Sequence, residues 1–434
     1  RVLLRPEAFD VPKAANGVVT GCGAAMKRPR HMSGRLRGDV GSGKTLVAVL
    51  AIVAAVTAGY QAALMVPTEI LAEQHYQKIA QLLAPMHVSV GLLTGSLAGT
   101  ARAKTLHDIA TGRLNVIIGT HALIQDAVKF AKLGLAVIDE QHRFGVNQRR
   151  ELRRKGLSPD VLMMTATPIP RTLAITTYGE MDVSTIDELP AGRHPIETAW
   201  LKSNQTGPVY ARLRAELAAG AQAYVVTPLI AESEAIDLRN AEDLYERMTK
   251  ALPQYHVALL HGQLKNQDKN AIMTAFSHNE IQVLVATTVV EVGMDVPNAN
   301  LMIIFDADRF GLSQLHQLRG RVGRGGRQAF CYLIADPKNQ VAISRMEAMV
   351  KTTNGFVLAE KDLQLRGPGD VFGDEQSGLP HFNIADPVGD SAMLEVAHAT
   401  AGQIFKEDPA LHAPDHQGIA AYLAELKRRN QYFD

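Results

Sequence analysis

The sequence predicts an α/β protein made of two tandem domains, each with a parallel β-sheet flanked by helices. Apolar segments of strand length alternate with longer helix-like segments in two successive blocks, which is the pattern of doubly wound domains. A glycine-rich loop of the phosphate-binding type leads into the first helix of the first block. The length of 434 residues leaves room for two or three domains.

The first block contains four apolar segments that we expect to be strands, at residues 62–66, 115–118, 135–138 and 161–164. Polar or acidic side chains follow each of them. Because ligands of open parallel sheets bind beyond the carboxyl ends of the strands, these side chains should share one edge. They include Thr68, Thr120, His121, Asp139, Glu140, Thr165 and Thr167.

The second block repeats the alternation, with expected strands at 223–227, 257–260, 282–286, 301–305 and 330–334. Between the blocks, residues 189–195 are rich in proline and glycine and are expected to be a linker. After about residue 345 the alternation stops, and a loop at residues 367–370 and a mixed helical tail follow. We therefore expect domains at 1–192, 193–345 and 346–434.

The loop is Gly38-Asp-Val-Gly41-Ser42-Gly43-Lys44-Thr45, which fits G-x-x-x-x-G-K-[ST]. Its backbone N–H groups would surround phosphates, with Lys44 on the β- and γ-phosphates and the Thr45 hydroxyl on Mg²⁺. The apolar helix expected from about residue 44 to 58 would point its positive dipole end at the phosphates. The alternative interpretation of this segment is a glycine-rich turn before a core helix, with no ligand.

A second motif supports the nucleotide site. The apolar strand from Leu135 ends in Asp139 and Glu140. A carboxylate at that position can hold Mg²⁺ opposite a phosphate loop, and Glu140 is placed to orient or deprotonate an attacking water. Strand-end acids also serve as helix caps. Together with the loop, however, they predict a site of nucleoside triphosphate hydrolysis.

Composition is ordinary for a globular protein, with 46% hydrophobic and 21% charged residues and a formal net charge of +1. A near-neutral sum does not argue for nucleic acid, although a local basic stripe is compatible with it. The two cysteines, Cys22 and Cys331, exclude a disulfide scaffold and a four-cysteine zinc site, and they suit a reducing compartment. No signal peptide or membrane-spanning apolar run stands out.

A concentrated cationic segment lies in the second block. No acid occurs between Phe310 and Ala335, a stretch that holds Arg319, Arg321, Arg324 and Arg327. Such arginines can reach across a cleft to a γ-phosphate and stabilise transition-state charge. A solvated basic loop or a contact with a phosphate backbone is the alternative.

In this order the motifs resemble those of superfamily 2 helicases, and most closely the RecG-type branch-migration helicases, over residues 36 to 385. The matching segments are Gly38–Thr45, Val66-Pro-Thr-Glu69 with Ala72-Glu-Gln-His75, Gly119-Thr-His-Ala122, Asp139-Glu-Gln-His142-Arg-Phe-Gly145, Thr165-Ala-Thr-Pro-Ile-Pro-Arg171-Thr, Ala286-Thr-Thr-Val-Val-Glu291-Val-Gly293-Met-Asp295 and Gln317–Arg324.

The resemblance implies two RecA-like motor lobes with ATP and Mg²⁺ in the cleft between them. Arg321 and Arg324 would be the arginines that act across the cleft, Gln317 a hydrogen-bonding residue of the cleft, and Asp295 a further nucleotide contact. Roles in DNA binding or in coupling fall on Thr68, Thr120, His121, Thr165, Thr167 and Thr287. The implied partners are branched duplex DNA and a single-strand-binding protein, and no membrane is implied. The implied location is the bacterial cytoplasm, at the nucleoid.

The tail extends the resemblance. Gly355-Phe-Val, Lys361-Asp-Leu-Gln-Leu-Arg366-Gly-Pro-Gly and Gln376-Ser-Gly378 are similar to the helical hairpin and loop with which the family moves on duplex DNA. Arg366 and Gln376 would then couple lobe closure to movement. They could instead be surface residues of a glycine-rich turn.

The chain also departs from the family pattern. Only 37 residues precede Gly38, so the family's N-terminal wedge domain is expected to be absent. Pro12 and Ala15 stand where the family has a threonine and a glutamine that reads adenine. Residues 16–37 read as a basic, glycine-rich segment where the family has a helix. Asp374 and Glu375 place acids beside the proposed DNA-contacting loop.

We expect an ATP-dependent duplex-DNA translocase that acts on junctions and stalled forks. Two alternatives stay open. The motor of a transcription-repair coupling translocase is similar, but Gln141 and Thr165 favour the branch-migration side. A nucleic-acid clamp that binds ATP without turnover is of another class, and the altered adenine-reading segment motivates it.

Overall fold

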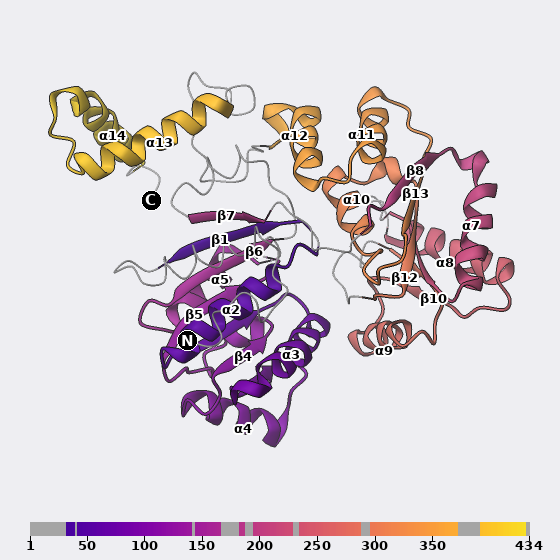
Figure 1. Ribbon diagram of the computed structural model, residues 1–434, viewed down its shortest axis with the longest axis horizontal. Coiled ribbons are helices and arrows are strands. Elements are labelled where there is room, and N and C mark those ends of the chain that lie inside the picture. Colours follow the sequence, from indigo (N-terminus) through magenta and orange to yellow (C-terminus); the bar gives the residue numbers. More distant parts are fainter. Residues whose placement is uncertain are drawn as a thin grey trace. The chain divides into compact units, whose positions relative to one another are not determined.

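The computed structural model describes residues 32–39, 41–140, 144–165, 182–186, 194–228, 234–287, 296–371 and 391–430. The chain divides into two compact units. The first comprises Arg1–Pro168 and Met181–Leu365, and the second Ile169–Glu180 and Arg366–Asp434. The first unit contains two parallel sheets with helices on both faces (Figure 1), which we call lobe 1 and lobe 2.

Lobe 1 is built on a seven-stranded sheet in the order β3-β4-β2-β5-β6-β1-β7. Every pairing in it is parallel. Its strands are β1 (Ser33–Gly38), β2 (Gln61–Met65), β3 (Val90–Leu93), β4 (Val116–Gly119), β5 (Leu133–Ile138), β6 (Asp160–Thr165) and β7 (Asp182–Ile186).

Both faces of this sheet are buried. Alternate residues of each strand point to opposite faces; in β2, Ala62 and Leu64 join one apolar core and Ala63 and Met65 the other. One core lies under α2 (Lys44–Thr57) and α3 (Glu69–Leu83), and the other under α4 (Gly99–Ala110) and α5 (Val146–Arg154). The loops at the carboxyl ends of the strands are thereby held by a sheet that is packed from both sides.

Lobe 2 has a six-stranded parallel sheet in the order β10-β11-β9-β12-β13-β8. The strands are β8 (Glu197–Leu201), β9 (Gln222–Val226), β10 (Val257–Leu260), β11 (Val283–Ala286), β12 (Ala299–Phe305) and β13 (Phe330–Ile334). Helices α7 (Gly207–Ala218) and α8 (Glu234–Ala251) pack on one face, and α9 (Asn266–Ser277), α10 (Leu312–Arg319) and α11 (Gln340–Lys351) on the other.

Helix α12 (Gly355–Val371) follows lobe 2 and begins within the first unit. The Asn354 side chain caps its start by accepting the backbone N–H of Phe356 at 2.9 Å, and buried Leu358 packs into the lobe 2 core. The second unit contains α13 (Ser391–Glu407) and α14 (Gln417–Asn430). No helix in the described part of the chain is long and apolar enough to cross a membrane.

The predicted fold class is confirmed, and all nine strands expected from the sequence are present within two residues of their expected ends. Four strands of the described residues were not predicted: β1, β3, β7 and β8. The segment at residues 16–37, described from the sequence as basic and glycine-rich, ends inside strand β1, Ser33–Gly38. Arg35 and Arg37 of this strand are buried, at 2% and 4% exposure. Because two of its buried residues are charged, the strand has no apolar pattern from which it could be predicted.

One correction concerns residues 367–370, which were expected to form a loop. They lie inside α12. Glycine and proline disfavour helix interiors, but the buried first half of this helix, with Leu358, Ala359 and Leu363, provides tertiary packing that outweighs local propensity. The expected linker falls partly outside the described residues, and residues 194–196 are irregular.

Candidate nucleotide site

The phosphate-binding loop leads from β1 directly into α2. Gly41 and Gly43 have left-handed φ values of 78° and 92°, which glycine adopts without steric cost. A Cβ atom at Gly38 would collide with the buried Ser42 side chain. The glycines predicted to be required by the motif therefore have a conformational or steric reason in the structure.

Lys44 lies at the first turn of α2 and is 9% exposed. Its Nζ donates to the backbone carbonyls of Gly38 at 2.9 Å and Asp39 at 2.8 Å. Burial lowers the pKa of Lys44, and the carboxylates of Asp139 and Glu140 act against that shift. A buried ammonium among these acids is positioned to receive phosphate oxygens.

Asp139 and Glu140 follow β5, as predicted. His75 Nε2 lies 3.4 Å from Asp139 Oδ2, and the Glu140 backbone N–H donates to Asp139 Oδ1 at 2.9 Å. Burial alone would raise the pKa of Asp139, but the hydrogen bond from His75 and the charges of His75 and Lys44 outweigh it, so the pKa lies below its usual value. Asp139 is therefore an ionised, hard oxygen ligand of the kind that Mg²⁺ prefers.

Glu140 has a left-handed φ of 49°, a conformation that is uncommon for a residue with a side chain. Such strain gathers at functional sites. The turn places Glu140 close enough for its charge to affect the pKa of Lys44. The structure thus brings the predicted base, the predicted metal ligand and the loop lysine together.

The predicted cleft residues of lobe 2 lie on α10 and the turn after it. Gln317 is 7% exposed, and Arg324 Nε donates to the carbonyl of Gly320 at 3.1 Å. The charge of Arg324 lowers the pKa of Lys44, although it is the smallest of the causes. Arg324 and Lys44 therefore act on one another electrostatically; Arg321 is half-buried in the same turn.

The residues predicted to bind DNA or to couple have mixed surroundings. Thr68 is the N-cap of α3, where its hydroxyl accepts the backbone N–H of Leu71 at 3.4 Å. Thr120, Thr165 and Thr287 are each 1% exposed at strand ends, whereas His121 is exposed. Their predicted roles stay predictions.

Several predicted residues fall on parts of the chain outside the described set. Thr167, Asp295 and Gln376 are among them, as are Gln141 and the N-terminal positions Pro12 and Ala15. Arg366 lies on α12, but its side chain is not described. Thr45 follows Lys44 on α2, and the metal-binding role of its hydroxyl also stays a prediction.

Sequence reasoning missed three polar residues around the loop: Asp39, His75 and His316. His75 was part of a quoted motif without a role. His316 Nε2 contacts Asp39 Oδ1 at 2.5 Å, although the two residues lie 277 positions apart. The one signal in the sequence was Asp39 itself, a charged residue at a position of the loop motif where any residue is allowed.

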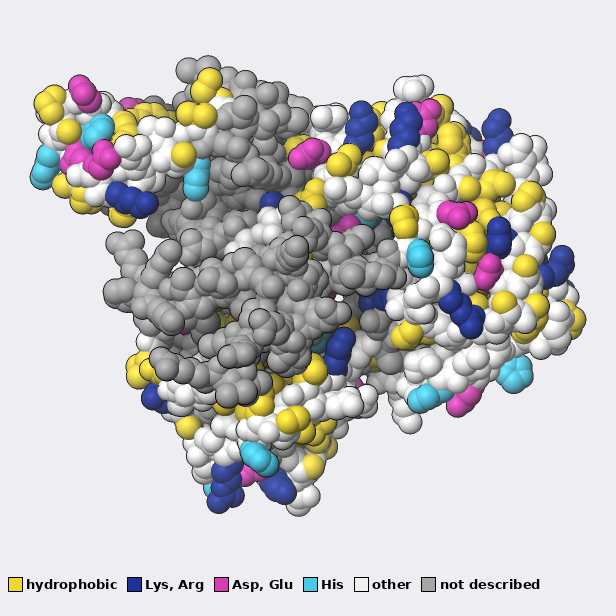
Figure 2. All heavy atoms as spheres, in the orientation of Figure 1, with side chains coloured by type: hydrophobic (Ala, Val, Ile, Leu, Met, Phe, Trp, Pro, Cys, Tyr) yellow, Lys and Arg dark blue, Asp and Glu magenta, His cyan; other side chains and the backbone are white. Residues whose placement is uncertain are grey.

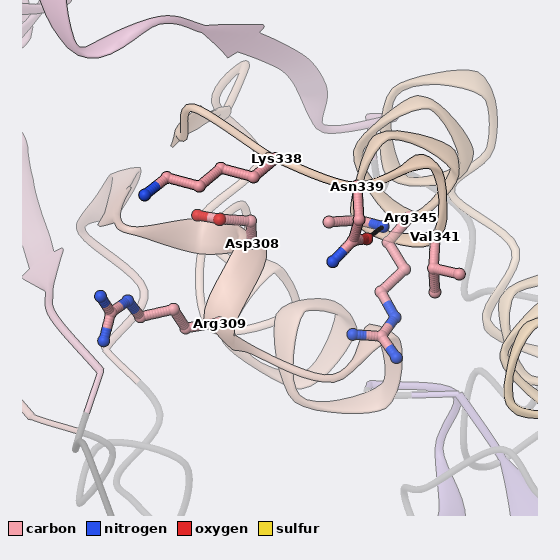
Figure 3. Close-up of a pocket in the computed structure, with 7 residues that line it drawn as sticks. Asp308, Arg309, Lys338, Asn339, Val341 and Arg345 are labelled. Carbon is pink, nitrogen blue, oxygen red and sulfur yellow. Dashed lines mark hydrogen bonds between the residues drawn. The ribbon is translucent and has the colours of Figure 1, made fainter.

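Lobe 2 also carries a hollow of about 410 Å³ beside η7 (Ala307–Arg309) and the start of α11. Its charged lining residues are Asp308, Arg309, Lys338 and Arg345. In Figure 3, Asp308 lies between Lys338 and Arg309, and Arg345 points away from them. These cationic side chains do not point toward a common position, so the hollow does not resemble an anion-binding site.

Among the described residues of the face drawn in Figure 2, basic side chains do not form a single continuous patch, and acidic side chains lie among them on lobe 2. This distribution agrees with the near-neutral net charge of +1. Any contact of this face with nucleic acid would depend on local groups of cations rather than on a broad positive field.

Family models match three consecutive parts of the chain. Residues 24–175 match the DEAD/DEAH box helicase model, residues 209–326 the helicase conserved C-terminal domain, and residues 352–433 the C-terminal part of domain 3 of ATP-dependent DNA helicase RecG. These segments correspond to lobe 1, lobe 2 and the helical tail.

The chain is similar to ATP-dependent DNA helicase RecG of Streptococcus pneumoniae serotype 4, with 56% identity over 399 residues that cover 92% of this chain and 59% of the relative. The Bacillus subtilis relative of the same name is 53% identical over 409 residues, covering 94% and 60%. The chain thus spans about three fifths of the length of the curated relatives it matches.

Solved structures agree. A structure of RecG bound to a three-way DNA junction matches with a TM-score of 0.74 and 42% identity, over 89% of this chain and 50% of that one. Dbp5 of S. cerevisiae bound to RNA and ADP BeF3 matches with a TM-score of 0.56 at 16% identity, over 81% and 93%, and so shares the fold alone. In both helicase lobes and in the C-terminal part of domain 3, the chain is therefore similar to the ATP-dependent DNA helicases of the RecG type.

Proposed function

We propose that this chain is the motor of an ATP-dependent duplex-DNA translocase that remodels branched DNA, such as four-way junctions and stalled forks. The observation that supports it best is that Asp139 and Glu140, which follow β5, lie close enough to Lys44 of the phosphate loop to affect its pKa, as does the charge of Arg324. A loop lysine, two strand-end acids and a distant arginine are the parts that phosphoryl transfer to water requires.

In this proposal the loop backbone and Lys44 bind the β- and γ-phosphates. Glu140 orients the attacking water and accepts its proton, while Asp139, held ionised by His75 and Lys44, and the Thr45 hydroxyl hold Mg²⁺. When bound, Mg²⁺ would neutralise developing charge on the phosphate oxygens. The donor set fits, because Mg²⁺ takes few protein oxygens and keeps several waters.

Arg321 and Arg324 would supply positive charge from lobe 2 as negative charge develops on the transferred phosphoryl group. Gln317, which is nearly buried on α10, would hydrogen-bond within the cleft, and Asp295 would contact the nucleotide. Because these groups come from a different lobe than the loop, hydrolysis would require both lobes.

DNA contacts would be directed mainly at phosphates, so binding should be salt-dependent and largely independent of sequence. Thr120, Thr165, Thr167 and Thr287 would couple the nucleotide to the DNA, together with Thr68 and His121. Arg366 and Gln376 would convert lobe closure into movement on the duplex. A single-strand-binding protein as partner and a place at the nucleoid in the cytoplasm belong to the same proposal.

ATP hydrolysis measured without DNA, with single strands, with duplex and with four-way junctions tests this function. We expect turnover to rise most with branched duplex and to fall as salt rises. Turnover that responds equally to single strands and junctions would contradict the branched-DNA proposal, and ATP binding without any turnover would favour the clamp.

Coupling is tested separately by Arg366→Ala and Gln376→Ala in a protein that includes the N-terminal region of its relatives. Each variant should hydrolyse ATP at close to the parent rate while junction unwinding per ATP falls sharply. Gln403→Ala, on the exposed surface of α13, is the matched control. Full unwinding by Gln376→Ala would mean that the tail is structural.

A further inference from the structure

Asp39 follows Gly38 in the phosphate loop and contacts lobe 2 through both of its carboxylate oxygens. Oδ1 lies 2.5 Å from His316 Nε2, and Oδ2 accepts the backbone N–H of Gly355 at 3.3 Å. His316 is on α10, next to Gln317, and Gly355 is the first residue of α12. One side chain of the loop thus reaches two helices of the other lobe.

The direction of the His316 contact follows from its other partner. Arg319 donates from its guanidinium to His316 Nδ1 at 2.9 Å. A guanidinium can only donate, so Nδ1 is the acceptor and the neutral ring carries its proton on Nε2. His316 Nε2–H therefore donates to Asp39, and the three side chains form a chain of hydrogen bonds that runs from Arg319 to the loop.

Arg319 fixes the far end of this chain. It is 1% exposed and donates to the backbone carbonyls of Met349 at 2.7 Å and Thr352 at 2.9 Å. Burial lowers the pKa of Arg319, and the charge of Asp39 is among the influences that oppose this. The hydrogen-bonded imidazole is consequently held in one orientation by an arginine that is itself hydrogen-bonded to the end of α11.

A separate contact joins the same two regions. The Arg37 guanidinium carbon lies 5.6 Å from the centre of the Phe356 ring, within the range of a cation–π interaction. Arg37 is on β1, immediately before the loop, and Phe356 follows Gly355 at the start of α12. The link between the loop and α12 therefore does not depend on a single hydrogen bond.

We propose that Asp39 is a positioning residue for hydrolysis: acting through His316, it holds α10 and the arginine turn that follows it in register with the phosphate loop. Lys44 Nζ donates to the backbone carbonyl of Asp39 at 2.8 Å. A change in the position of Lys44 on binding phosphate would therefore be passed to Asp39 and on to α10. This role rests on the proposed ATP hydrolysis.

Asp39→Asn tests the proposal. Asparagine offers one carbonyl oxygen where two donors, His316 Nε2–H and Gly355 N–H, need acceptors. We expect kcat for ATP to fall about tenfold or more with KM within about twofold, because the loss acts on the transition state rather than on nucleotide binding. Asp126→Asn removes an exposed carboxylate of the same lobe and should change neither constant.

Double substitution separates positioning from general damage. His316→Ala should lower kcat as Asp39→Asn does, and the double variant should lose no more than Asp39→Asn alone, since that substitution already removes the His316 contact together with the Gly355 contact. His316→Gln, whose amide can donate from near the position of Nε2, should recover part of the loss. Losses that multiply in the double variant, or an unchanged kcat in Asp39→Asn, would overturn the proposal.

Amide hydrogen exchange tests the contact between Asp39 and Gly355 without depending on ATP turnover. In Asp39→Asn the Gly355 amide should exchange at least about tenfold faster than in the parent, and Asp126→Asn should match the parent. If the parent protein does not hydrolyse ATP, the proposed function is wrong but the Asp39 contact is still testable. If exchange at Gly355 is unchanged in Asp39→Asn, the role of Asp39 is overturned.

Discussion

Lobe 1 and lobe 2 share one framework and differ in the loop that follows one strand. In sheet order, β3-β4-β2-β5-β6-β1 of lobe 1 corresponds position by position to β10-β11-β9-β12-β13-β8 of lobe 2. Strand β1 runs into the glycine-rich loop and Lys44, while its counterpart β8 runs into Lys202 and a short turn before α7. The same arrangement of strands therefore carries the predicted phosphate loop in lobe 1 and a short turn at the corresponding position of lobe 2, which agrees with the rule that function depends on the site rather than the fold.

The correspondence extends to single side chains. Gln61 and Gln222 are the buried first residues of β2 and β9, and each donates its amide to two backbone carbonyls. Thr120 and Thr287 follow β4 and β11 and are equally buried. The two glutamines belong to the shared framework, so we expect the difference in nucleotide chemistry between the lobes to come from residues that the lobes do not share.

The acids after the central strands show the difference most clearly. Glu140 after β5 and Asp306 after β12 have similar left-handed φ values of 49° and 47°. Asp139, beside Glu140, has a lowered pKa because His75 and Lys44 outweigh burial. Burial instead raises the pKa of Asp306. The ionised form is therefore favoured for Asp139 of lobe 1 and disfavoured for Asp306 of lobe 2.

The largest expected effect concerns the contribution of lobe 2 to hydrolysis. Arg324→Ala should reduce turnover roughly 10³-fold or more while leaving nucleotide affinity little changed. Arg327, whose guanidinium donates to Ala219 O at 3.2 Å on the exposed surface, provides the matched Arg327→Ala control. Steady-state ATPase rates check this, and equal losses in both variants would indicate a general basic patch instead.

The next effect contrasts the two strand-end acids. Glu140→Gln should reduce turnover about 10²–10⁴-fold, as loss of a general base does, and should retain ATP binding because the loop is untouched. Asp306→Asn should leave turnover within about threefold. The division of roles between the lobes fails if Glu140→Gln keeps parental turnover or Asp306→Asn loses as much.

The shared framework should respond alike in both lobes. Gln61→Ala and Gln222→Ala each remove an amide that two backbone carbonyls use, which should lower the free energy of unfolding by about 1–3 kcal/mol. Urea unfolding, with the exposed Gln81→Ala as control, measures this. A large loss in one lobe and none in the other would argue against an equivalent framework.

The smallest effects should have opposite signs. Asp306 has a raised pKa, so its ionised form is disfavoured in the fold, and Asp306→Asn should raise the melting temperature at pH 7. Asp139 has a lowered pKa, so its stabilisation is present above the unfolded-state value, and Asp139→Asn should lower the melting temperature.

Both differences in melting temperature should shrink as the pH falls and the parent carboxylates become protonated. The difference for Asp306→Asn should disappear first, because the pKa of Asp306 is raised, and that for Asp139→Asn last, because the pKa of Asp139 is lowered. Asparagine tolerates a left-handed φ well, so backbone strain should not mask the result at residue 306. Melting curves between pH 3 and pH 7 check this, and shifts of the same sign would contradict the contrast.

Local patterns were sufficient to predict most of the framework. Apolar strands such as β10 and β13 were expected at their observed bounds, and the loop was recognised because its glycines and Lys44 are consecutive. Strand β1 was missed because its inward residues include Arg35 and Arg37, whose burial depends on the assembled lobe. The Asp39–His316 contact joins residues 277 positions apart, and no local pattern contains that information.

Nucleotide binding tests most directly the claim that one lobe alone carries the phosphate site. Titration calorimetry with a non-hydrolysable ATP analogue and Mg²⁺ should give one site per chain. Lys44→Ala should weaken that site about tenfold or more, as loss of a charge-assisted hydrogen bond does, and Lys202→Ala in lobe 2 should leave it unchanged. Two sites per chain, or equal weakening by both substitutions, would contradict the account.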